Sequence, residues 1–297
     1  MTTPTTQESR DRARMGLLIY FAVLLPSTAV LEWLLLRAGD SIRNHLGLVL
    51  PLMWMPALAS IVARLALKEG FVDISFRFGG RAVLRMTLMA WLYPLAVGAL
   101  AYGFGWASGL AAFKSPPVPG LPTVSAPLAT FSALVAIRLT IGVPIAAIAA
   151  AGEEIGWRGY MLTRFIEAGL PNPILLTGVV WAGWHLPLIL GGVYASGLHP
   201  VASAGLFCIT IPALGCLLAR VRLTSGSIWP AIVGHSAWNT TIQGVFDFST
   251  VPDPTALWVG ESGVLVAVAS VALTSVLVQG PWPRYRAPGV PIAAAAA

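Results

Sequence analysis

Two adjacent carboxylates and an arginine follow a long apolar run in this sequence. After residues 144–151, built only from Pro, Ile and Ala, come Gly152, Glu153 and Glu154, with Arg158 one helical turn later. An ionisable side chain inside a membrane span costs about 3 kcal/mol even on the lower scales, so its presence indicates a functional site by default. The alternative is that the helix leaves the membrane here and that Glu154 and Arg158 form an ordinary i,i+4 surface pair. Polar residues further along the chain bear on this choice.

The two glutamates cannot share one role. Adjacent residues on a helix point about 100° apart, so only one of the two carboxylates faces a given neighbouring helix. We predict that Glu153 faces the bundle interior and takes part in chemistry, while Glu154 pairs with Arg158 and braces the helix.

Two further stretches place polar side chains in apolar runs. His185 stands one helical turn after Trp181, and His235 and Asn239 are four positions apart, so both can point at a single atom. A lone histidine in such a run is more often a hydrogen-bonded packing residue, and one polar pair can simply join two helices. Polar residues on three apolar stretches favour a shared site.

The composition is that of a membrane-spanning protein. Hydrophobic residues make up 57% of the 297 residues and charged residues only 10%, against about 25% charged in soluble domains. The formal net charge is +6, but the basic residues form no stripe, so no nucleic-acid partner is expected. The two cysteines, Cys208 and Cys216, lie about 12 Å apart along one helix and cannot form a disulfide with each other.

Apolar runs separated by polar residues predict an all-α, polytopic transmembrane helical bundle of about eight spans. The first run is too long for the apolar part of a signal peptide and is taken as a retained span. The expected spans are 15–36, 46–67, 86–106, 128–152, 173–190, 201–221, 228–246 and 262–279. The chain divides into a cytoplasmic tail 1–14, N-terminal helices 15–127, a catalytic core 128–246, an outer loop with the last helix 247–279, and a low-complexity tail 280–297 expected to be disordered.

The basic residues predict the orientation of the bundle. An N-terminus on the inside places these on the cytoplasmic side: Arg10, Arg12, Arg14, Arg64, Lys68, Arg77, Arg81, Arg85, Arg158, Arg164, Arg220, Arg222, Arg284 and Arg286. Only Arg37, Arg43 and Lys114 are left outside, with Arg138 near the outer edge of a span. This positive-inside bias predicts a multi-pass protein of the cell membrane with both termini in the cytoplasm. The Pro-rich connection 115–127 then faces outward, as does the loop with Asp247, Asp253 and Glu261.

The depth of the fourth span affects the site. If residues 128–152 span the membrane, Glu153 lies at the cytoplasmic end, whereas His185 lies past the middle of its own span. A span from about Arg138 to Arg164, kinked at Pro144, reduces this mismatch and is preferred. The site is then expected in the cytoplasmic half of the bilayer, in a water-containing cavity.

Small residues and one mixed segment shape the scaffold. Gly105 with Gly109, and Gly152 with Gly156, offer small faces at which helices can approach closely. Residues 71–85 mix Phe and Ile with Asp and Arg, which fits either a cytoplasmic segment in the membrane interface or an ordinary basic loop.

Taken together, the polar motifs resemble those of a known protease family. In chain order they are E-E-x-x-x-R at Glu153, Glu154 and Arg158, an aromatic-x-x-x-H at Trp181 and His185, and H-x-x-x-N at His235 and Asn239. They resemble the CAAX protease and bacteriocin-processing family (CPBP, also called Abi) of intramembrane proteases, which includes the Rce1-like type II CAAX prenyl proteases. The similarity covers about residues 128–245. Where many members have Phe, this chain has Trp181, which keeps an aromatic wall beside the histidine.

The resemblance implies peptide-bond hydrolysis within the membrane. It implies that Glu153 and His185 activate water and that His235 and Asn239 stabilise the oxyanion. Amide hydrolysis needs a base for water and donors for the oxyanion, and these four side chains can supply both without a serine or cysteine nucleophile. A zinc alternative stays open, in which Glu153, His185 and His235 bind the ion and water takes the fourth position. The resemblance favours the metal-free glutamate mechanism, which requires no cofactor.

The expected partners are the lipid bilayer and a membrane-embedded or lipidated peptide, such as a prenylated or leader peptide. A non-catalytic immunity or scaffold protein of the same fold is the alternative, and it would not need Glu153 and His185 together. A transporter could use the carboxylates for proton coupling, but no inverted repeat or pair of broken helices is visible in the sequence.

The charge bias predicts the outcome of a protease-protection experiment. Tags fused to either end of the chain should be shielded from external protease in intact cells, because both ends are expected inside. A tag inserted after Lys114 serves as the accessible control. An accessible C-terminus would show that the spans are miscounted.

Overall fold

The computed structural model describes residues 6–118, 127–195, 197, 199–252, 257–283 and 285. Over these residues the chain forms a bundle of 8 helices without a β-strand, which confirms the expected all-α class. Asp253, Arg284, Arg286, most of the tail 280–297, the first five residues and the centre of the connection 115–127 lie outside the described residues.

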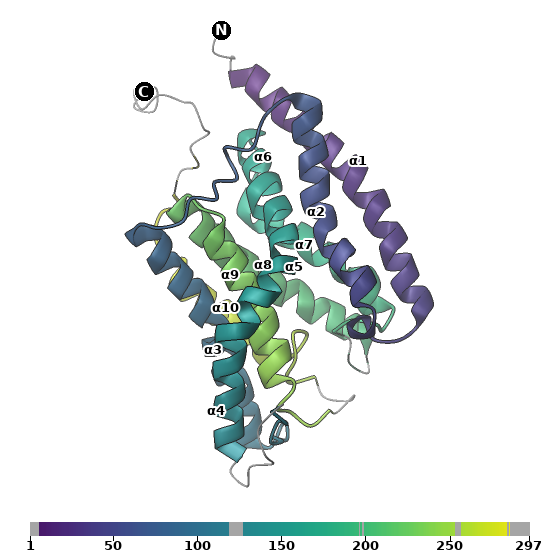
Figure 1. The fold of residues 1–297 in the computed structure, drawn as a ribbon, viewed down its shortest axis with the longest axis vertical. Coiled ribbons are helices and arrows are strands. Elements are labelled where there is room, and N and C mark those ends of the chain that lie inside the picture. The colour runs from purple at the N-terminus through teal and green to yellow at the C-terminus, as the bar shows by residue number, and fades with distance from the viewer. Residues whose placement is uncertain are drawn as a thin grey trace.

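The helices follow the predicted spans closely (Figure 1). The first three are α1 (Thr6–Ala38), α2 (Leu46–Leu67), preceded by the short 3₁₀ turn η1 (Ile42–Asn44), and α3 (Arg81–Ser108). The fourth helix is continuous and consists of α4 (Pro127–Ile137), the π-helical turn η2 (Arg138–Gly142), α5 (Val143–Gly156), the π-helical turn η3 (Trp157–Met161) and α6 (Leu162–Glu167). The last four are α7 (Pro173–Leu190), α8 (Pro200–Ser225), α9 (Trp229–Trp238) continued by the π-helical η4 (Asn239–Phe246), and α10 (Val264–Leu277).

The outer faces of these helices suit a lipid environment. Among the described residues, 6 helices are long and apolar enough to cross a membrane, and α10 is a shorter apolar helix. Leu18, Leu25, Ile145 and Ile148 are 65%, 60%, 65% and 62% exposed, as expected where lipid replaces water. The chain is therefore a multi-pass membrane protein.

The fourth helix is long enough to contain both of the spans predicted for it. Residues Pro127–Glu167 form one helix of 41 residues, which at the helical rise is about 60 Å long, roughly twice the thickness of the hydrocarbon core. In Figure 1 it runs from α4 at the bottom of the view to α6 near the top. Both 128–152 and 138–164 therefore lie on the same helix.

Close packing against α2 fixes the rotation of this helix. A Cβ atom added to Gly152 would lie 2.6 Å from the carbonyl oxygen of Met53, and one added to Gly156 would lie 2.3 Å from Cβ of Pro56. The small face at Gly152 and Gly156 is thus confirmed as a helix contact. The prediction of a second small helix face at Gly105 and Gly109 was wrong. Gly109 ends α3 with a positive φ of 77°, and a Cβ atom added there would have no neighbour within 4 Å.

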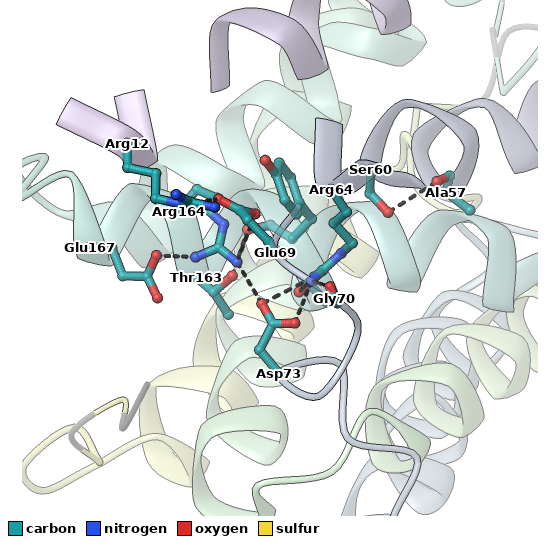
Figure 2. Close-up of polar contacts among 12 residues, drawn as sticks. Arg12, Ala57, Ser60, Arg64, Glu69, Gly70, Asp73, Thr163, Arg164 and Glu167 are labelled. Carbon is teal, nitrogen blue, oxygen red and sulfur yellow. Dashed lines mark hydrogen bonds and ion pairs between the residues drawn. The ribbon is translucent and has the colours of Figure 1, made fainter. Parts of the chain in front are cut away.

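A buried ion cluster joins the connection between α2 and α3 to the fourth helix (Figure 2). Nη2 of Arg64 donates to Asp73 at 3.1 Å and to the carbonyl of Gly159 at 3.0 Å, and Nη2 of Arg164 donates to Asp73 at 2.7 Å. Arg164 also pairs with Glu167. The side chains of Arg64 and Asp73 are only 0% and 7% exposed. Because Gly159 follows Arg158, this cluster anchors the helix that carries the paired glutamates.

The helix ends form two groups. At one end, Arg12 near the start of α1 pairs with Glu69, and Nη1 of Arg220 donates to the carbonyl of Pro281, just past α10. At the other end, the amide of Ile42 donates to the carbonyl of Val193. The first helix therefore begins, and the last one ends, at the same end of the bundle, which is the arrangement that both termini on one side of a membrane require.

Four of the arginines counted for the orientation do not lie on the surface. Arg64, Arg158, Arg164 and Arg222 are at most 7% exposed and interact with other protein groups. The argument for a cytoplasmic N-terminus therefore rests on the remaining basic residues, and the orientation stays a prediction.

The ion cluster leads to a stability prediction. Asp73→Ala should lower the free energy of unfolding by about 3–5 kcal/mol, because it leaves the buried guanidinium groups of Arg64 and Arg164 without this carboxylate. The matched control is Asp11→Ala in the exposed pair with Arg14, which should change stability by less than about 0.5 kcal/mol. Thermal unfolding in detergent measures both, and equal melting of the two variants would contradict the anchoring role.

Candidate active site

One cavity brings together all four predicted catalytic side chains. It has a volume of about 180 Å³ and is bounded by η1, α2, α5, α7, α8 and the α9–η4 helix. Glu153, His185, His235 and Asn239 all line it, together with apolar side chains of α2 and α8. Three polar stretches separated along the chain therefore meet at one place, as the polar residues in three apolar runs led us to expect.

Glu153 is held by two tryptophans. Its Oε2 accepts hydrogen bonds from Nε1 of Trp181 at 2.7 Å and from Nε1 of Trp157 at 3.2 Å. The residue is 2% exposed, and its Oε1 accepts no hydrogen bond from the described residues. One carboxylate oxygen is thus fixed by neutral donors, and the other is left for a reacting group in the cavity.

Trp181 has a larger role than the aromatic wall expected from the sequence. Besides donating to Glu153, its ring lies 4.2 Å from the guanidinium carbon of Arg158 and 5.0 Å from the ring centroid of His235. A phenylalanine at this position would keep these ring contacts but would lose the hydrogen bond to Glu153.

Glu154 does face away from the cavity and pairs with Arg158, as predicted. Nη1 of Arg158 lies 2.8 Å from Oε1 of Glu154, and both side chains are 0% exposed. The alternative of an ordinary surface pair is therefore wrong. Glu154 has a second partner that the sequence did not indicate, since the same Oε1 lies 2.9 Å from Nδ1 of His235. The brace thus also orients a ring of the site.

His185 lies in a cage of aromatic rings. Its Nδ1 is 2.9 Å from the carbonyl oxygen of Trp181, one turn earlier on α7, so Nδ1 donates and Nε2 carries the free lone pair in the neutral ring. The ring of Tyr194 stacks on it at a centroid distance of 5.5 Å, and Trp184 meets it edge-on at 4.7 Å.

Asn239 differs from the other three because its amide has no partner among the described side chains and backbone groups. It is the first residue of η4 and is only partly buried where it lines the cavity. Both amide hydrogens are thus available to a ligand. Ser236, in contrast, donates to the carbonyl of Ile232 at 2.8 Å and is absent from the cavity lining, so it is not placed as a nucleophile.

The sequence missed a third carboxylate in the cavity, Glu261. It lies between η4 and α10 and is 4% exposed, and its two oxygens accept hydrogen bonds from Tyr194, Trp238 and Gln243. Burial, and next the negative charge of Glu261, raise the pKa of the Tyr194 hydroxyl well above its usual value, so this hydroxyl stays protonated and donates. The sequence places Glu261 only in an outward-facing loop, and the apolar residues Leu257, Trp258 and Val259 before it were the local sign of burial.

The zinc alternative names Glu153, His185 and His235 as ligands, and all three line the cavity. Among the described residues, no group of three or more His, Cys, Asp or Glu side chains could hold a metal ion. Oε2 of Glu153 accepts hydrogen bonds from two indole N–H groups, and Nδ1 of His235 is hydrogen-bonded to Glu154.

The cavity extends from the middle of the bundle towards one of its ends. Ile42, Arg43, Tyr194 and Glu261 line the cavity, and they belong to the connections after α1, after α7 and before α10. These connections lie at the end of the bundle that the charge count places outside. The cavity therefore extends towards that end from the mid-helix positions of Glu153 and His235, and the depth of the site in the membrane stays a prediction.

Comparison with known proteins supports the resemblance based on the motifs. Residues 130–241 match a family model described as type II CAAX prenyl endopeptidase Rce1-like. The predicted Rce1-like relationship is thus confirmed, and the matched segment contains every site residue predicted from the sequence. The match supports a CAAX-type intramembrane endopeptidase in general. None of the curated proteins matches the chain.

The buried Glu154–Arg158 pair leads to a second stability prediction. Arg158→Ala should lower the free energy of unfolding by about 3–5 kcal/mol and lower activity as well, because it leaves a buried carboxylate and removes the cation beside Trp181. Arg14→Ala, in an exposed pair, is the control and should leave both unchanged. A fully stable but inactive Arg158→Ala protein would instead indicate direct contact with substrate.

Proposed function

We propose that this chain is an intramembrane endopeptidase that hydrolyses a peptide bond of a membrane-embedded or lipidated peptide. The observation that carries the proposal is that Glu153, His185, His235 and Asn239, from three separate helices, line one cavity. The substrate follows from the setting, because a small, largely apolar cavity inside a membrane protein receives peptides that already partition into the bilayer.

Glu153 and His185 are assigned to water activation. The free Oε1 of Glu153 takes a proton from water as the water oxygen attacks the carbonyl carbon of the peptide bond. The other oxygen keeps its two indole partners during this step, which holds the carboxylate in position. His185 presents Nε2, since its Nδ1 donates to the backbone of its own helix.

His235 and Asn239 are assigned to the oxyanion that forms on the carbonyl oxygen. Nδ1 of His235 is bound to Glu154, so a protonated ring offers Nε2–H to the substrate. Asn239 offers an amide N–H to which no other group among the described residues is hydrogen-bonded. When the tetrahedral intermediate collapses, the C–N bond breaks and the amine leaves with the proton that Glu153 took from water.

The division of roles predicts the effect of two substitutions. Asn239→Ala should lower turnover by roughly 100-fold with little change in substrate affinity, since an oxyanion donor acts mainly in the transition state. Glu153→Gln should abolish turnover and still bind the peptide. The measurement is cleavage of a membrane-reconstituted peptide by purified protein. The control is Ser236→Ala, which should stay active because Ser236 lies on the same helix as Asn239 but does not line the cavity.

The same purified protein can be used to test whether the activity depends on a metal ion. The metal-free proposal expects full activity without stoichiometric zinc, whereas a zinc enzyme would lose activity reversibly with a strong chelator and lose bound metal in His185→Ala. Elemental analysis beside the chelator assay separates the two mechanisms. If neither the variants nor the chelator changed a confirmed biological activity, the protease proposal would fail and a non-catalytic scaffold of the same fold would replace it.

A further inference from the structure

Glu261 is a buried carboxylate whose hydrogen-bond partners among the described residues are neutral. Among the described residues, no Lys, Arg or His lies within ion-pair distance of it, and its partners are the neutral donors of Tyr194 at 2.6 Å, Trp238 at 2.5 Å and Gln243 at 2.9 Å. A buried carboxylate held only by neutral donors is costly, so its presence beside a reactive cavity calls for a function. It lies outside the segment 130–241 that matches the family.

The partners of Glu261 belong to both halves of the site. Tyr194, after α7, stacks on the ring of His185 with an interplanar angle of 27°. Trp238 directly precedes Asn239 on the α9–η4 helix, and Gln243 follows one turn later. A single carboxylate therefore connects the ring beside the water-activating histidine to the helix that carries the oxyanion donors.

Glu261 also lies between two cavities. The catalytic cavity and a second, more open cavity of about 380 Å³ share Ile42, Arg43, Tyr194 and Glu261 in their linings. The segment that carries Glu261 is itself tied down, because the amide of Gly260 donates to the hydroxyl of Tyr102 at 2.9 Å. The hydrogen bond from Tyr194 to Glu261 thus belongs to the partition between the catalytic cavity and the open one.

We propose that Glu261 is a positioning residue that holds Tyr194 against His185 and holds the Asn239 helix in register, closing the catalytic cavity towards the open one. The inference rests on the proposed hydrolytic function for its kinetic consequence. Its geometric consequence, a shielded and fixed His185, holds whatever the reaction.

The experiment compares Glu261→Gln, Tyr194→Phe and the double variant with wild type. Glu261→Gln keeps the side-chain volume but replaces one acceptor oxygen by a donor, and Tyr194→Phe keeps the ring stack but removes the hydroxyl. Asp40→Asn is the matched control, because Asp40 is an exposed carboxylate at the same end of the bundle that bonds Asn44 and lines neither cavity. Two quantities are measured: kcat and KM for peptide cleavage, and the rate at which diethylpyrocarbonate labels His185, resolved by mass spectrometry of the modified peptide.

Glu261→Gln should lower kcat by roughly 10- to 100-fold, the scale expected when catalytic groups are displaced, and leave KM unchanged. The double variant should lose less activity than the sum of the two single losses, because both changes act on the same Tyr194–Glu261 contact. His185 should be labelled faster in Glu261→Gln than in wild type or Asp40→Asn.

Unchanged kcat with unchanged labelling, or a loss of kcat that only follows the loss of folded protein, overturns the positioning role. A raised KM with unchanged kcat overturns it in favour of direct substrate contact. If wild type cleaves no peptide while Glu261→Gln still exposes His185 to the reagent, the proposed function fails and the positioning role stands.

Discussion

The burial of carboxylates within an apolar bundle is the constraint on which the rest of this structure depends. A buried carboxylate without donors is strongly destabilising, so each one must be met by groups from elsewhere in the fold. Glu153 is hydrogen-bonded to two tryptophans, Glu154 to an arginine and a histidine, and Asp73 to two arginines. Because many of these donors stand on other helices, the acids set the relative positions of the helices along with apolar packing.

The fourth helix is where these demands meet. Its glycines press against the backbone of α2, which directs Glu153 towards the cavity and Glu154 towards the pairing arginine. The π-helical turn η3 follows at once and carries both Arg158 and Gly159, whose carbonyl receives the guanidinium of Arg64. One long helix therefore links the ion cluster at one end of the bundle to the reactive groups near the middle. A change in the cluster is expected to act on stability, and a change around the cavity is expected to act on the proposed reaction.

The cavity also connects the mechanism to topology. It is bounded in part by the connections after α1 and α7, so it extends towards that end of the bundle. A site of this kind needs groups that hold the reactive side chains fixed and keep bulk water from the intermediate. Hydrogen-bonded aromatic residues meet both needs, since they fill space and offer a single directed donor.

The sequence by itself predicted the helices and the four polar residues that line the cavity. An apolar run of about 20 residues has few alternatives to a helix in a membrane, and Glu153, His185, His235 and Asn239 had no apolar packing reason to occupy such runs. The tertiary structure alone decided which donors serve each carboxylate and which end of the bundle holds the cavity. Trp181 donates to Glu153, His235 lies within hydrogen-bond distance of Glu154, and Glu261 accepts from Tyr194, 67 positions earlier. Spacing along one helix shows which residues share a face, but it carries no information about which other helix that face meets.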